Sequence, residues 1–291
     1  MLRKLEIENI NMGKRLFVKA KEFVENCIVD FNKNLPMDFE YDLKVCFENS
    51  KNPKDIASFT FRRGKNYLFI YQTFVKSVLD GDYECYPIIF HELCHLYDNF
   101  HVRNCQYTKF DPSKSSDDTA RNMLLDIGYR AWTEFYAYLK QLKVNEYKYA
   151  YPTTKQMVEW YKKIVLINKK IMNLSDSREM KKTACELKQE IEKFSYFCSM
   201  YLAGSISAKR RYYTYASKTT NSKEYKWFEK FSCGLIKRFA KMFTGTYGKY
   251  LERRLYNIGV YIFKELYIPF GIHLQRINRK WHLVKVFDKE D

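Results

Sequence analysis

The segment His91-Glu92-Leu93-Cys94-His95 constrains the fold of this chain more than any other feature of its sequence. Side chains four residues apart on an α-helix share one face, so both imidazoles can reach a single ion at about 2.0 to 2.1 Å. Glu92 would then point toward the open position on that ion, where a carboxylate can take a proton from bound water. We therefore expect the chain to fold around one zinc ion held by a helix.

The residues around this motif continue a helical apolar pattern. Pro87 suits the first turn of a helix, where its missing N–H costs nothing. Cys94 lies at a different place on the helix from the two histidines, which favours a buried packing thiol, with a redox-sensitive thiol as the alternative. Apolar residues recur at helical spacing through the motif: Ile88, Ile89, Leu93, Leu96, Tyr97 and Phe100.

A site of this kind needs a third protein ligand, and Glu134 is the first candidate. A helix is expected from Asp117 or Asp118, as its cap, to about Lys143. A carboxylate on a buried stripe is costly unless it is paired or bound to a metal, and an arginine or a boundary position is the alternative partner. When the helix is projected, Glu134 falls in the middle of an apolar stripe and lies opposite Asp126, Arg130, Thr133 and Lys140.

His101 is the alternative third ligand, because it completes the metzincin spacing of three histidines that starts at His91 and His95. Metzincins place Gly where this chain has Asp98, since their helix ends there in a left-handed turn. His101 is otherwise expected at the surface or beside the ligands. Asp98 could accept the free ring N–H of a ligand histidine and fix its tautomer, or it could be an exposed carboxylate near the helix end.

The patterns along the chain predict an α+β fold that is mainly helical, with a small antiparallel sheet of about three strands beside the motif helix. Residues 1–150 are expected to form a metallopeptidase domain, and residues 151–291 a basic, aromatic-rich region that is helical throughout. The expected strands span 42–48, 56–61 and 67–71, the last two joined as a hairpin through Gly64. The other expected helices span 14–32, 156–172, 177–202, 223–243 and 247–266.

The net charge of +17 is unevenly distributed. Residues 1–150 hold 22 Lys and Arg against 21 Asp and Glu, whereas the remaining residues hold 29 against 13. The basic half is either a solvated helical surface or a contact for nucleic acid, an anionic membrane surface or an acidic protein partner. Lys209, Arg210 and Arg211, with tyrosines just after them, are the candidate nucleic-acid contacts.

The sequence also bounds the location that we expect for the protein. No segment approaches the roughly 18 uncharged apolar residues of a membrane span, and the N-terminal segment does not have the pattern of a secretory signal. Eight cysteines without a CxxC pair fit free thiols in a reducing compartment. A cytoplasmic protein is therefore expected.

The motif residues together resemble the gluzincin-type zincins, and among these the ImmA/IrrE-like metallopeptidases. The resemblance rests on the order of helix, sheet, HExxH helix and a second helix with a glutamate in an ExxA context, here Glu134 to Ala137, and it covers about 39–143. It implies His91, His95 and Glu134 as zinc ligands and Glu92 as general base. It also makes the strand 65–71 a candidate edge that binds an extended substrate by strand addition.

Three functions follow as hypotheses. The leading one is zinc-dependent hydrolysis of peptide bonds in an intracellular protein or peptide, through zinc-bound water activated by Glu92. The second is a nucleic-acid-binding or protein-interaction protein with a structural or inactive zinc site. The third is a toxin or effector whose protease domain acts in another cell.

Overall fold

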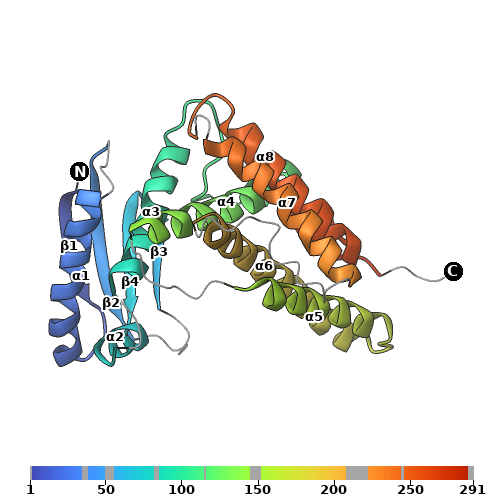
Figure 1. Ribbon diagram of the computed structural model, residues 1–291, viewed down its shortest axis with the longest axis horizontal. Coiled ribbons are helices and arrows are strands. Elements are labelled where there is room, and N and C mark those ends of the chain that lie inside the picture. Colours follow the sequence, from blue (N-terminus) through green and yellow to red (C-terminus); the bar gives the residue numbers. More distant parts are fainter. Residues whose placement is uncertain are drawn as a thin grey trace. The chain divides into compact units, whose positions relative to one another are not determined.

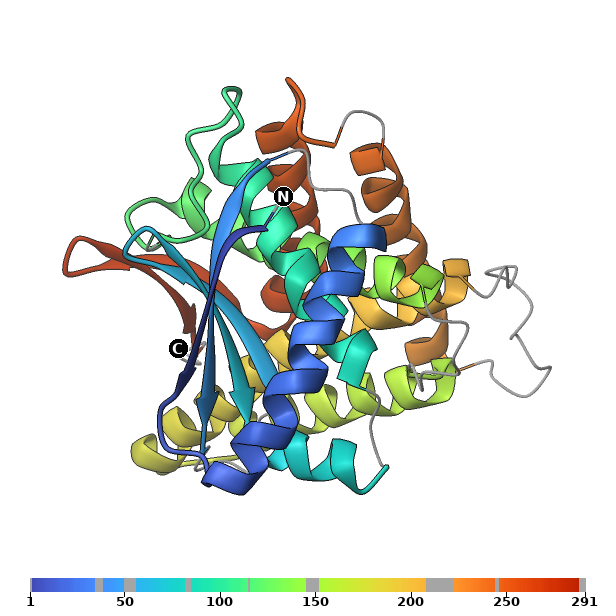
Figure 2. The ribbon, with the colours of Figure 1, turned by 90° about the vertical axis from the view of Figure 1, so that its left-hand side faces the viewer.

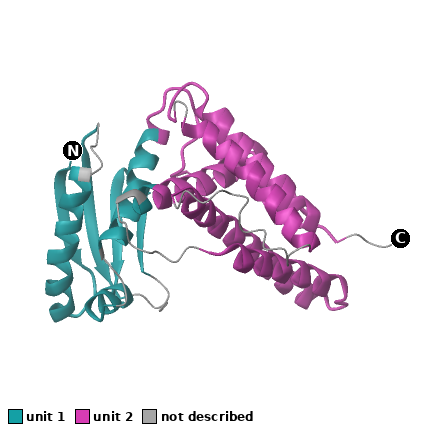
Figure 3. Cartoon of the chain, viewed as in Figure 1, with its two compact units in different colours: residues 1–101, 140–147 teal, residues 102–139, 148–291 magenta. Residues whose placement is uncertain are grey.

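The computed structural model describes residues 2–34, 39–49, 56–81, 85–114, 116–144, 152–207, 222–243 and 246–287 (Figure 1). Its contacts divide the chain into two units, of which the first comprises residues 1–101 and 140–147 and the second residues 102–139 and 148–291 (Figure 3). The second unit thus includes residues 102–139, which lie in the first of the two domains expected from the sequence. The predicted fold class, α+β and mainly helical, is confirmed.

The first unit contains a four-stranded sheet in the order β1-β2-β4-β3. β1 (Leu2–Asn9), β2 (Tyr41–Glu48) and β4 (Lys65–Tyr71) are parallel neighbours, and β3 (Ala57–Arg62) runs antiparallel to β4. The three predicted strands and their hairpin are therefore confirmed. The sheet is mixed rather than purely antiparallel, because β2 is parallel to both β1 and β4. β1 was not predicted from the sequence, although its residues 4–8 alternate polar and apolar side chains.

The hairpin between β3 and β4 places β3 at the edge of the four-stranded sheet. Arg63 and Gly64 both have positive φ, 51° and 77°, which is the conformation of a two-residue type I′ turn. β4 pairs with β2 on one side and with β3 on the other. The expectation that strand 65–71 is a free edge is therefore wrong, because β3 occupies that edge.

Helix α1 (Lys14–Asn34) connects this sheet to the motif helix α3 (Cys85–Arg103). Figure 2 shows α1 running alongside the strands. Phe17 of α1 meets Phe47 of β2 edge-on, with ring centroids 5.2 Å apart, and Phe31 meets Phe90 of α3 at 5.0 Å. Because Phe90 directly precedes His91 and is itself buried, this packing fixes the rotation of α3 about its axis. A short helix, α2 (Gln72–Leu79), follows β4 directly.

The second unit is a helical assembly with a C-terminal hairpin. The predicted helices are confirmed as α4 (Ala120–Val144), α5 (Thr154–Met172), α6 (Ser177–Ser207), α7 (Lys223–Phe243) and α8 (Leu251–Ile262). A π-helical turn (Phe263–Tyr267) and a 3₁₀ turn (Ile268–Phe270) continue α8. The hairpin of β5 (Ile272–Ile277) and β6 (Lys280–Lys285) departs from the helical pattern predicted throughout this region.

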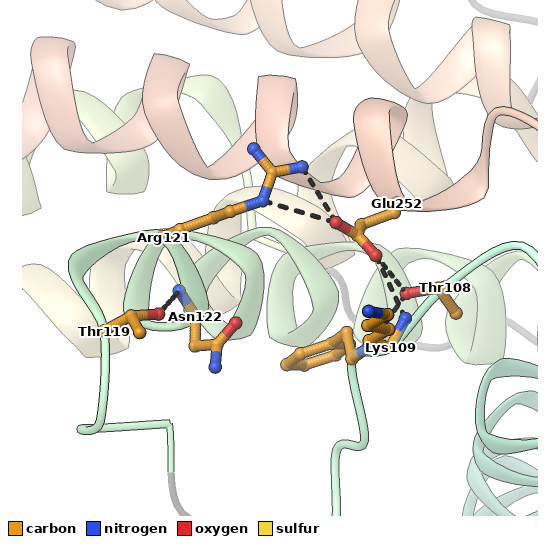
Figure 4. Close-up of polar contacts among 7 residues, drawn as sticks. Thr108, Lys109, Thr119, Arg121, Asn122 and Glu252 are labelled. Carbon is orange, nitrogen blue, oxygen red and sulfur yellow. Dashed lines mark hydrogen bonds and ion pairs between the residues drawn. The ribbon is translucent and has the colours of Figure 1, made fainter.

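Helix α4 is more deeply buried than a two-sided projection predicts. Thr133, expected on the polar side, is only 7% exposed. The rings of Phe135 and Phe239 stack with centroids 4.4 Å apart, so α4 packs closely on α7. Thr119 caps the helix, since its Oγ1 accepts a hydrogen bond from the backbone N–H of Asn122, and this corrects the expectation of a cap at Asp117 or Asp118 (Figure 4).

Helix α8 is tied to the start of α4 by Glu252 (Figure 4). One carboxylate oxygen accepts hydrogen bonds from the Thr108 hydroxyl at 2.8 Å and from the Lys109 backbone N–H at 3.1 Å. The other accepts from Arg121 Nη2 at 2.8 Å. Partial burial raises the pKa of Glu252, but these hydrogen bonds outweigh burial and hold the pKa below its ordinary value of 4.5.

We expect Glu252→Gln to lower the free energy of unfolding at pH 7 by about 1 to 3 kcal/mol, because the charge-assisted bonds are lost. A carboxyl whose pKa is lowered by folding stabilises above its unfolded pKa, and this contribution disappears as the pH falls through the folded pKa. The difference from wild type should therefore shrink between pH 5 and pH 3, measured by denaturant unfolding. Glu186→Gln, on an exposed position of α6, is the matched control and should change little. An undiminished difference at pH 3 would contradict this role.

Candidate metal centre

The two motif histidines occupy one face of α3, as the sequence predicts. Their Nε2 atoms lie 3.0 Å apart, and their rings are nearly perpendicular, with centroids 4.7 Å apart. Two nitrogens bound to one tetrahedral zinc ion at about 2.05 Å would be separated by about 3.3 Å. The pair therefore has the spacing that a shared ion requires.

Glu134 completes the group. The ligand atoms of His91, His95 and Glu134 all lie within 4.8 Å of one another, and no other group of this kind occurs in the described part of the chain. Imidazole nitrogens and carboxylate oxygens are common metal ligands, and a site with three protein ligands leaves coordination positions open. These residues could hold a metal ion.

Burial prepares His91 for metal binding. Its residue is 7% exposed, and burial lowers the pKa of the imidazole, against the opposing effects of the Glu92 charge and of a hydrogen bond with Gln141. The ring is therefore neutral at neutral pH, which is the form that binds metals.

Gln141 was not anticipated from the sequence. It lies on α4 seven residues after Glu134, two turns along the same helix face, so the spacing was available as a signal. Its side chain acts on the buried imidazole of His91 and raises the pKa of that ring against the larger effect of burial, so Gln141 is placed beside a candidate ligand histidine.

We expect Gln141→Leu to weaken metal affinity about 10- to 100-fold, because the ligand histidine loses the partner that orients it. Leu has a similar volume, so the change removes the hydrogen bond with little loss of packing. The measurement is competition for Zn²⁺ against a chromophoric chelator. Gln189→Leu, at an exposed position on α6, is the control, and equal metal affinities for the two variants would contradict the role of Gln141.

Glu92 is anchored to the edge of the sheet. Its Oε2 accepts a hydrogen bond of 2.7 Å from the backbone N–H of Phe59 in β3. Because this N–H points away from β4, the antiparallel register places the backbone groups of Ala57 and Phe61 on the same outer side of the strand. The candidate general base therefore lies beside the outer edge of β3, a contact that no side-chain pattern could reveal.

Glu134 also lines a cavity inside the second unit. The cavity has a volume of about 430 Å³. Burial raises the pKa of Asp126 on its wall, against the opposing effect of Arg130, and burial likewise raises the pKa of Tyr267. Tyr267 ends the π-helical turn, a rare element that is frequent at functional sites. The cavity is lined by side chains of both polarities, among them Met123, Asp126, Arg130, Thr133, Glu134, Tyr196 and Tyr267.

The remaining predicted site residues are not members of the three-residue metal group. His101 is not in the metal group, and its ring lies in an aromatic cluster, 4.3 Å from the ring of Tyr97. Asp98 is fully buried, which excludes the exposed helix-end carboxylate. Cys94 is also buried, and burial raises the pKa of its thiol, as expected of a packing residue. Lys209, Arg210 and Arg211 lie outside the described residues.

Comparisons of the chain with protein-family models, with curated proteins and with solved structures found no match. The resemblance to gluzincins therefore rests on the motif residues and stays a prediction. No helix in the described part of the chain is long and apolar enough to cross a membrane.

Proposed function

We propose that this protein is a zinc-dependent peptidase of the gluzincin type. The observation that carries the proposal is that the ligand atoms of His91, His95 and Glu134 lie within 4.8 Å of one another, while Glu92, the glutamate of the motif, directly follows His91. A purely structural zinc site normally uses four protein ligands, whereas the described residues supply three to this group.

We choose zinc over iron because of Glu92, which directly follows the ligand His91. Two histidines and a carboxylate also suit non-haem iron, which serves oxygen chemistry. Glu92 provides a base suited to hydrolysis instead. When bound, the metal would polarise the carbonyl of the scissile peptide bond and make a water molecule easier to deprotonate.

The remaining steps are assigned to groups of the protein itself. Glu92 takes the proton from the attacking water and passes it to the leaving amine, while the Phe59 N–H holds its carboxylate in place. Gln141 is the polar neighbour that would orient the His91 imidazole toward the metal. The outer edge of β3 would pair with an extended substrate by strand addition, which brings a peptide bond alongside Glu92.

The test is cleavage of an unfolded protein mixture by the full chain, with products identified by mass spectrometry. We expect cleavage that a chelator abolishes and that Zn²⁺ restores in about one equivalent per chain, whereas Fe²⁺ does not. His101→Ala should cleave like wild type, because His101 lies outside the metal group. Cleavage that persists without metal would contradict the proposal.

A further inference from the structure

A second cavity lies between α7 and α8 in the second unit. Its lining shares no residue with the cavity that contains Glu134. Its volume is about 360 Å³. The two helices are neighbours along their length (Figure 1). Among the described residues that line it, five are Lys or Arg and none is Asp or Glu: Lys237, Arg238, Lys241, Arg254, Asn257, Val260, Tyr261 and Lys264.

The nearest carboxylate on α8 is engaged elsewhere. Glu252 binds Arg121 and the loop at Thr108 and Lys109 (Figure 4). Glu265 follows Lys264 and is not among the described residues that line the cavity, but its charge acts on the wall residue Tyr261 and offsets part of the positive charge there. Five like charges around one cavity repel one another, so an anion bound among them gains attraction from all of them.

Two side chains in the wall of the cavity, Arg238 and Tyr261, are held by contacts with each other and with the backbone of α7. The Arg238 guanidinium stacks on the Tyr261 ring, 3.8 Å from its centroid, and donates to the Gly234 carbonyl at 2.7 Å. Tyr261 in turn donates from its hydroxyl to the Phe231 carbonyl at 3.1 Å. Any side chain at Gly234 would overlap Tyr261, so glycine is what lets this ring reach α7. Arg238 is therefore held in place with further N–H donors available to a ligand.

We propose that this cavity binds a compact polyphosphate, that is, two or more linked phosphoryl groups. Arginine forks match phosphate oxygens, and each such hydrogen bond is strengthened by charge. A single phosphate would neutralise less than half of the five cations, whereas a triphosphate brings about four negative charges. The volume equals that of about a dozen waters, more than one phosphate group fills. A concave site also favours a compact anion over a nucleic-acid backbone, which needs an extended basic track.

The same chemistry occurs in soluble polyphosphate compounds and in lipid headgroups that carry several phosphates. Both kinds of ligand present linked or clustered phosphoryl groups, which the basic cavity would recognise. The proposed phosphate site does not depend on the metal centre, and it would stand if the peptidase proposal failed.

The test uses the full chain and measures binding of sodium tripolyphosphate by calorimetry at fixed ionic strength. We expect saturable one-to-one binding, at least about tenfold tighter than that of inorganic phosphate. The double variant Lys237→Gln/Lys264→Gln removes two cavity charges and keeps the side-chain stems, and it should bind at least about tenfold more weakly. Lys155→Gln/Lys169→Gln on α5 removes the same net charge at exposed positions outside the cavity and should bind like wild type.

The comparison between the two double variants also controls for capture of the bound metal by tripolyphosphate, because both keep the same metal centre. A second arm uses phosphatidylcholine vesicles with phosphatidylinositol bisphosphate. Vesicle binding that only the cavity variant loses would assign the ligand to a lipid headgroup, and binding of the soluble anion alone would assign it to a soluble compound. Equal binding by the two double variants, or binding only to oligonucleotides with affinity that rises with length, would overturn the proposal.

Discussion

Glu92→Gln is expected to abolish peptide cleavage while the protein keeps its metal. The amide can still accept the hydrogen bond from the Phe59 N–H, so the local geometry should survive. It cannot accept the proton of the attacking water, and loss of a general base costs about 10²- to 10⁴-fold in rate. The measurement is the cleavage rate of the same substrate mixture, together with the metal content of each protein.

The matched control is Glu186→Gln, which makes the same chemical change at an exposed position on α6 and should leave the rate unchanged. A Glu92→Gln protein that holds metal and cleaves as fast as wild type would remove Glu92 from the mechanism. A variant that loses both cleavage and metal would instead give Glu92 a role in holding the site together.

Gly259→Ala should destabilise the second unit severely. α4 and α8 cross where Gly128 and Gly259 face each other, and a β-carbon on Gly259 would overlap the backbone carbonyl of Leu124. Backbone cannot rotate away as a side chain can, so the helices must separate and their contacts loosen. We expect a loss of about 3 kcal/mol or more in the free energy of unfolding, although alanine by itself favours a helix by about 1 kcal/mol.

Denaturant unfolding measures this loss, and Gly13→Ala is the control because a β-carbon there meets nothing within 4 Å. Gly128→Ala should behave like Gly259→Ala, since its β-carbon would overlap the carbonyl of Leu255. The crossing also holds the helix that carries Glu134, so metal affinity should fall with stability. Unfolding of Gly259→Ala at the wild-type denaturant concentration would show that the helices do not cross this closely.

The features that depend on short-range spacing were predictable from the sequence. The i, i+4 histidines and the apolar residues around them place the motif on a helix, and the structure has α3 there. Glu134 was recognised because a carboxylate on an apolar stripe needs a partner. The hairpin through Gly64 followed from two alternating segments and a turn residue between them, and it is confirmed.

The features that depend on strand order and on backbone contacts were not predictable. Strand 65–71 is internal, but its sequence alone did not separate an inner strand from an edge strand. The Phe59 N–H that holds Glu92 has no side-chain signature at all. Gly128 and Gly259 are 131 positions apart, and nothing local marks them as partners. The terminal hairpin was obscured by Leu, Ile and aromatic residues that suit helices equally well.

Metal content is the most direct test of the central claim. Purified wild type, Glu134→Ala and His101→Ala would be dialysed side by side against a weak chelator and analysed for zinc. The geometry predicts about one zinc per chain in wild type and in His101→Ala, and little or none in Glu134→Ala. Zinc that is lost with His101 and kept without Glu134, or no zinc in wild type, would contradict the assignment of His91, His95 and Glu134 as the metal ligands.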